Sequence, residues 1–188
     1  MARQLFVFDR PDRFVAGTVG QPGERTFFLQ ATDGDRVVSV ALEKQQVTLL
    51  AERLETLLAD IERRTGERLG APAAPDLGAL STPIDEEFRV SAMGLAWNAD
   101  TGMVIIEAQA PVEDVAVAEQ TLLEDTEDGP DALRVQLLPT QARAFAERAR
   151  QVVGAGRPPC PLCGAPLDPA GHVCPRHNGY HRSTPSPG

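Results

Sequence analysis

The chain has 188 residues and a mass of 20.2 kDa, enough for one compact domain with a small appendage and too little for a large multidomain enzyme. Lys and Arg total 18 against 27 Asp and Glu, and a net charge of −9 argues against a nucleic-acid binder that neutralises phosphates. No apolar run approaches the ~20 residues of a membrane span, and the start of the chain lacks a signal-peptide pattern. We therefore expect a cytoplasmic protein that binds neither nucleic acid nor membrane.

Four short segments rich in Phe, Val and Thr predict an antiparallel meander at the start of the chain, because turn sequences with Pro or Gly separate them. These segments are residues 4–8, 14–19, 26–31 and 36–42. From residue 43 to residue 64, apolar side chains recur every three or four positions, at Val47, Leu50, Leu54, Leu57 and Ile61. This period predicts an amphipathic helix with one buried face.

Residues 65–83 are rich in Pro, Gly and Ala and have no hydrophobic period, so they are typical of a linker. After the linker the pattern of strands returns. We expect strands at residues 88–97, 103–110 and 133–138, a helical piece around 115–123, and a second long helix over 139–153.

Most of the net charge lies in residues 113–131, which contain no basic residue. The eight acidic residues there are Glu113, Asp114, Glu119, Glu124, Asp125, Glu127, Asp128 and Asp131. Runs of like charge are usually solvated loops, which is the simplest interpretation. The alternative is a docking surface for a basic partner, whereas the missing D-x-D-x-D-G spacing disfavours a calcium loop.

An internal repeat relates residue n to residue n+95: residues 38–54 align without a gap with residues 133–149. Val40 matches Val135 and Leu42 matches Leu137, and the apolar stripes of the two helices coincide. Any strand followed by an amphipathic helix can give such a match by chance, and this remains the alternative. We expect an α+β domain over residues 1–153, an antiparallel sheet with two helices on one face, built from two β-meander-plus-helix halves of about 1–65 and 84–153.

The chemically specific signal is at the C-terminal end, where all three cysteines lie. Cys160 and Cys163 form a Cys-x-x-Cys-Gly turn, and Cys174 follows with His172 before it and His177 after it. Three thiolates and one imidazole make a closed tetrahedral zinc site, and the spacing after Cys174 favours His177 as the fourth ligand. Free surface cysteines and a redox Cys-x-x-Cys are the alternatives. We expect a structural Zn2+ in a zinc-knuckle segment over 154–181, followed by a disordered tail over 182–188.

Four segments of the chain resemble the DUF3090 family of uncharacterised actinobacterial proteins: Phe6 to Gly20, Gly23 to Gln30, Val38 to Gln46 and Cys160 to Tyr180. In the family pattern the last segment reads Gly-His-x-Cys-Pro-Arg-x-Asn-Gly. The resemblance thus implies a metal set of Cys160, Cys163, His172 and Cys174, with His177 as the rival fourth ligand. It also implies a genomic setting beside a histidine-phosphatase-like protein and a lipid-kinase-like protein, which are possible partners.

The residues before the cysteine cluster offer little catalytic chemistry. No histidine precedes His172, which removes the usual general base, and the common nucleophile motifs are missing. Glu107 is expected to be an outward-facing strand residue. Arg10, Arg13 and Arg25 could bind an anion, but solvated turn arginines are the simpler interpretation. We expect a non-catalytic zinc-bearing interaction or scaffold protein with a protein partner. The alternative is a small enzyme or binding protein that acts on a phosphorylated or other anionic substrate through Arg and carboxylate side chains.

Overall fold

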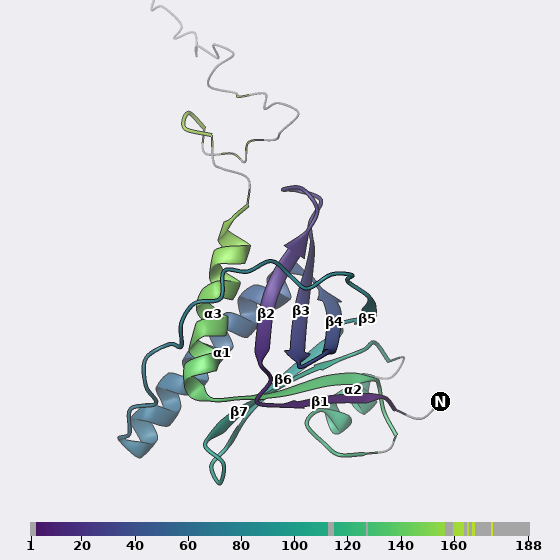
Figure 1. Cartoon of the computed structure of the whole chain (residues 1–188), viewed down its shortest axis with the longest axis vertical. Coiled ribbons are helices and arrows are strands. Elements are labelled where there is room, and N and C mark those ends of the chain that lie inside the picture. The colour runs from purple at the N-terminus through teal and green to yellow at the C-terminus, as the bar shows by residue number, and fades with distance from the viewer. Residues whose placement is uncertain are drawn as a thin grey trace, which may run out of the picture.

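The computed structural model describes residues 3–112, 115–126, 128–156 and 160–163, together with residues 165, 167 and 174. Within these residues no helix combines the length and the apolar character that crossing a bilayer would need. Figure 1 shows the body of the chain, with the described part of the cysteine segment beyond the end of its last long helix.

The first half of the chain forms four strands and a long helix: β1 (Leu5–Asp9), β2 (Arg13–Val19), β3 (Thr26–Asp33), β4 (Arg36–Leu42) and α1 (Lys44–Thr65). The second half repeats this pattern with one short extra helix: β5 (Glu86–Arg89), β6 (Ala92–Asn98), β7 (Met103–Gln109), α2 (Val115–Thr121), β8 (Ala132–Leu137) and α3 (Pro139–Gly154). The expected strands and helices are therefore present, except that the strand expected over 88–97 is divided in two.

The strands form two four-stranded sheets, with the orders β2-β3-β4-β5 and β1-β8-β7-β6. Each sheet is an antiparallel meander that gains one parallel edge strand, because β5 pairs with β4 and β1 pairs with β8. Each half thus gives its first strand to the sheet of the other half. The α+β class and the repeated meander-plus-helix halves are confirmed. The structure differs from the single sheet that we expected because the chain bends between β1 and β2, and again between β5 and β6.

The repeat extends to the way in which both long helices begin. The Glu43 N–H donates to the side-chain oxygen of Gln46 at 2.8 Å, and the Leu138 N–H donates to that of Gln141 at 3.0 Å. Each glutamine lies three residues after the cap and satisfies an N–H that the helix leaves unpaired. Both pairs are related by the offset of 95 residues, so the repeat found in the sequence is structural.

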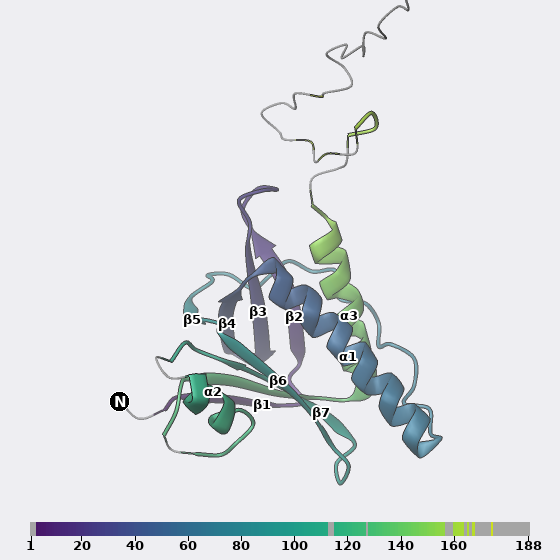
Figure 2. The same cartoon turned by 180° about the vertical axis from the view of Figure 1, so that it is seen from behind.

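One hydrophobic core joins the two halves. It takes alternate residues from the strands, such as Phe14, Leu29 and Val135, and the apolar stripes of α1 and α3. The two long helices pack against each other, and Figure 2 shows them crossing on one side of the sheets. The rings of Phe14 and Phe145 stack with their centroids 4.7 Å apart, which anchors α3 against β2.

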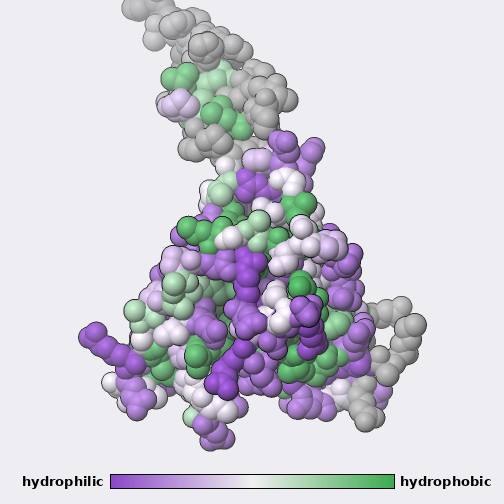
Figure 3. Space-filling view, viewed as in Figure 1, coloured by the Kyte–Doolittle hydropathy of each residue, from purple (hydrophilic) through white to green (hydrophobic). Residues whose placement is uncertain are grey.

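The linker crosses the outer face of the sheet β2-β3-β4-β5, as Figure 1 shows. The buried side chain of Gln30 accepts the Ser81 N–H at 2.7 Å and donates to the Ser81 carbonyl at 3.0 Å. Leu80 lies on Gly17, so closely that a Cβ at Gly17 would be 2.6 Å from the leucine side chain. The linker is therefore held on the sheet by specific contacts, and Figure 3 shows this face as a mixture of hydrophilic and hydrophobic side chains.

The segment between β7 and β8 covers the outer face of the other sheet in a similar way. Leu122 lies on Gly94 of β6, where an added Cβ would be 2.8 Å from it. The described acidic side chains of this segment, such as Glu124, Asp125 and Asp128, are exposed, as the solvated-loop interpretation expected, but Leu122 and the Leu123 N–H face the sheet. A count of charges could not show this, since the contacts involve Leu122 and backbone atoms.

Candidate metal centre

A tight turn after α3 presents two of the three cysteines. The turn runs through residues 161–163, and the Cys160 N–H closes it by donating to the Ala165 carbonyl at 2.7 Å. The turn brings the side chains of Cys160 and Cys163 to the same side of the chain, as the Cys-x-x-Cys spacing predicted. Cys174 then returns to this point from eleven residues further along the sequence.

The three sulfur atoms lie within 4.8 Å of one another. Cys160 and Cys174 are buried, with 6% and 7% of their surface exposed, and Cys163 is half-buried. The Cys160 and Cys174 Sγ atoms are 3.9 Å apart, far beyond the ~2.05 Å of a disulfide. Two thiolates bound at ~2.3 Å to a tetrahedral zinc ion lie about 3.8 Å apart, so the observed distance fits metal ligation.

The backbone of the turn favours a thiolate at its first cysteine. Hydrogen bonds from the Cys163 and Leu162 N–H groups lower the pKa of Cys160 from its ordinary value of 9.0 to about 6. The pKa of Cys163 is raised instead: the Ala165 N–H lowers it, but desolvation and the neighbouring Cys160 and Cys174 sulfurs outweigh that effect. Cys160 therefore favours its thiolate form, which is the form in which a cysteine binds a soft metal ion.

The fourth ligand predicted for this site lies outside the described residues. This holds for His172, which the family pattern implies, and for His177, which the spacing favours. The structure thus brings together Cys160, Cys163 and Cys174 as a group that can hold a metal ion, and the choice of histidine stays a prediction.

A second polar cluster lies inside the body, around Glu107, whose carboxylate is fully buried. One of its oxygens accepts hydrogen bonds from Arg3 at 3.0 Å, Gln109 at 2.9 Å and the Leu123 N–H at 3.2 Å. The other accepts from Arg134 at 2.6 Å. Glu107 does point away from the core, on the opposite face of β7 from Ile106 and Ala108, but solvent does not reach it because the segment after β7 folds over it.

The same two arginines also bind the segment after β7 that covers Glu107. The Glu124 carbonyl accepts from Arg3 at 2.9 Å and from Arg134 at 3.0 Å, and Arg134 forms an ion pair with Asp125. This cluster is a latch that joins Arg3, just before β1, and strands β7 and β8 to residues 123–125. Its two arginines, Arg3 and Arg134, are 131 residues apart in sequence, and no local spacing could have revealed it.

The predicted solvated arginine Arg13 is instead bound to the linker. Its guanidinium donates to the two carboxylate oxygens of Asp76 at 2.5 and 2.9 Å, and Arg148 lies 3.2 Å from the same carboxylate. The hydrogen bond from Arg13 lowers the pKa of Asp76 to about 2, and the Gly78 N–H and the charges of both arginines act in the same direction. Asp76 thereby fixes the middle of the linker against α3.

Comparison with known proteins gives one match. A family model described as a protein of unknown function, DUF3090, matches residues 6–174, which include the body and all three cysteines. No curated protein matches the chain, and no solved structure matches it.

Proposed function

The chain belongs to the DUF3090 family, described only as proteins of unknown function, and we propose that it is a non-catalytic, zinc-bearing interaction protein. In this proposal Cys160, Cys163 and Cys174 hold one Zn2+ with a histidine, His172 or His177. The α+β body is a platform, and the metal orders a segment that contacts a protein partner. The phosphatase-like and kinase-like proteins suggested by the resemblance are the first partners to test.

The observation that carries the proposal is the convergence of three thiols within 4.8 Å of one another, two of them buried, on a segment that follows the last helix of the body. A site closed by four protein ligands leaves no open position for water or substrate. The role of such a site is therefore to fold the segment that contains it. In small zinc modules the free energy of metal binding, about 10 kcal/mol or more, is what stabilises the folded segment.

A second candidate is the binding of an anionic substrate. It is supported by a cavity of about 600 Å³ beside the end of α3, which Arg25 and Lys44 both line. Arg25 also donates to the Ala155 carbonyl, a contact that ties the β2–β3 turn to the end of α3. A phosphate titration followed by NMR tests this candidate: shifts confined to this cavity and lost in Lys44→Gln support it, and their absence removes it.

The zinc proposal is tested by metal analysis of chains that differ in one ligand. Cys163→Ser should lower the zinc content well below one ion per chain, since a hydroxyl is a poor ligand for zinc. His172→Ala and His177→Ala form a matched pair, and only the variant that removes the true ligand should lose metal. Retention of full zinc by both histidine variants would contradict a site made of three thiolates and one of these histidines.

The interaction role needs its own measurement. Tagged wild-type chain and Cys163→Ser are recovered from the source cells and compared by quantitative mass spectrometry. We expect a partner enriched with the wild-type chain and depleted with the variant, while circular dichroism shows the same folded body in both. Identical sets of co-purifying proteins would show that the cysteine segment does not present the partner surface.

A further inference from the structure

The pseudo-twofold repeat creates two equivalent gaps, each between a long helix and an open edge strand. One gap lies between α3 and β2, and the other between α1 and β6. The offset of 95 residues relates their helical walls: Leu49, Leu50 and Arg53 line the second gap where Ala144, Phe145 and Arg148 line the first. The two gaps differ because a segment of this chain covers the first, whereas none of the described residues covers the second.

The gap beside β2 keeps a cavity of only about 150 Å³, and it is covered by an extended segment of this chain, the linker. Arg148 binds it by donating to the Gly78 carbonyl at 2.7 Å, to the Asp76 carbonyl and to the Asp76 carboxylate at 3.2 Å. The Nε–H of Arg148 donates to the carbonyl of Ala16 on β2 at 2.8 Å. One buried arginine thus joins the strand to two carbonyls and a carboxylate of an extended peptide. Residues 14–17 of β2 are buried, Phe14 and Ala16 by the core and Gly17 under Leu80 of the linker.

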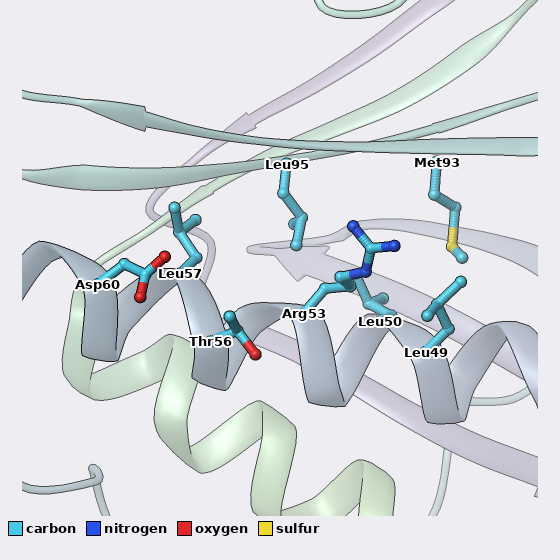
Figure 4. A pocket seen from close by; sticks show the side chains of 8 residues that line it. All are labelled: Leu49, Leu50, Arg53, Thr56, Leu57, Asp60, Met93 and Leu95. Carbon is cyan, nitrogen blue, oxygen red and sulfur yellow. The ribbon is translucent and has the colours of Figure 1, made fainter.

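The gap beside β6 has no such segment among the described residues. It is an open groove of about 420 Å³, and all seven residues of β6 are half-exposed. Figure 4 shows Leu49 and Leu57 from α1 facing Met93 and Leu95 from β6, with the guanidinium of Arg53 between the two elements. Within the described chain Arg53 is exposed and has no hydrogen bond or ion pair, although its counterpart Arg148 has four acceptors.

We propose that the groove between α1 and β6 binds an extended, acidic segment of a partner protein. Arg53 donates hydrogen bonds to a carboxylate and to nearby backbone carbonyls of that segment, as Arg148 donates to the carboxylate of Asp76 and to the carbonyls of Asp76 and Gly78. The apolar walls at Leu49, Met93 and Leu95 receive a small or aliphatic side chain, and the open edge of β6 offers backbone hydrogen bonds, as in strand addition to a sheet edge. This site extends the proposed interaction role to the body and does not depend on the metal.

The linker itself supplies a defined probe, because it is the peptide that the equivalent gap binds. A fluorescent peptide with the sequence of residues 72–81, Pro-Ala-Ala-Pro-Asp-Leu-Gly-Ala-Leu-Ser, is titrated with the full-length chain and followed by anisotropy. We expect saturable binding, weakened about tenfold or more by Arg53→Gln, since hydrogen bonds to charged groups contribute about that factor. The matched control is Arg64→Gln, which removes an exposed arginine of the same helix outside the groove and should leave the affinity unchanged.

Further measurements show which residues contact the probe and whether the metal site is needed for binding. A probe with Asn in place of its Asp should bind the wild-type chain as weakly as the original probe binds Arg53→Gln, and NMR shifts on binding should map to Met93 and Leu95. Cys163→Ser should bind the probe normally, so that failure of the zinc proposal and failure of this one are distinguishable. The proposal is overturned if the probe does not saturate, if Arg53→Gln binds it as well as wild type, or if sedimentation shows that the groove is already closed by a second copy of the chain.

Discussion

Removal of the Glu107 carboxylate is expected to destabilise the body strongly. Glu107→Ala leaves two guanidiniums without their shared anion: the side chain of Arg3 is 1% exposed and that of Arg134 is 11% exposed. Breaking a buried ion pair by removing one partner costs about 3–5 kcal/mol. A domain of this size is stable by about 5–15 kcal/mol, so the variant loses a large share of its stability.

Glu107→Ala should lower the stability of the whole body and also loosen residues 121–126 locally. Because Asp125 remains beside Arg134, we expect the lower half of that range, about 3 kcal/mol, and a melting temperature lower by roughly 6–12 °C. The Leu123 N–H also loses its acceptor, so residues 121–126 should be cleaved by protease before the rest of the body.

Urea denaturation followed by circular dichroism measures the global cost, and Glu52→Ala on the exposed face of α1 is the control. The control should change stability by less than about 0.5 kcal/mol. Replacing all three charges with Arg3→Met, Glu107→Leu and Arg134→Met should recover most of the loss, because apolar residues of similar volume leave no buried charge unpaired. A cost below about 1 kcal/mol for Glu107→Ala, or early proteolysis elsewhere, would refute this account of the latch.

Three other outcomes follow from the structure. Asp76→Asn should lower stability by about 1 kcal/mol at pH 7, a value reduced for the 37% exposure of the carboxylate. Since the pKa of Asp76 is about 2 in the folded chain and near 3.8 ordinarily, this difference should be present above pH ~4 and disappear as the pH falls toward 2; a constant difference across that range would contradict it. Gly17→Ala should cost about 1–3 kcal/mol because its Cβ meets Leu80, and Leu80→Ala in the same chain should recover part of the loss; additive costs in chemical denaturation would show that the two do not touch. Truncation after Gly156 should leave a body that melts cooperatively in calorimetry, because the described core lies almost entirely before that residue; an unfolded body would show that the cysteine segment belongs to the core.

The secondary structure could be predicted from sequence because its signals are local. The apolar period of residues 43–64 and the turn residues between the first strands each depend on neighbours a few positions apart. The exchange of β1 and β5 between the halves could not be predicted. It depends on parallel pairing between residues far apart in sequence: more than 40 residues for β4 and β5, and more than 120 for β1 and β8. The sequence of a short edge strand does not indicate which strand it pairs with.

The candidate site shows the same division. Cys160, Cys163 and Cys174 could be identified because metal ligation demands particular residue types at short spacings. The latch around Glu107 and the pairing of Arg13 with Asp76 could not be identified from the sequence. Arg, Glu and Asp are usually exposed residues, and only the tertiary fold brings these together and buries them. Arg53 became a candidate only when the structure showed that its repeat partner Arg148 is engaged and that Arg53 itself is not.

Native mass spectrometry of the full-length chain, purified under reducing conditions without added metal, tests whether the three cysteines hold a zinc ion. We expect one zinc ion per chain and three thiols that react with a thiol reagent only after a chelator removes the metal. A metal-free chain with a native circular dichroism spectrum and three freely reactive thiols would contradict zinc binding by these cysteines.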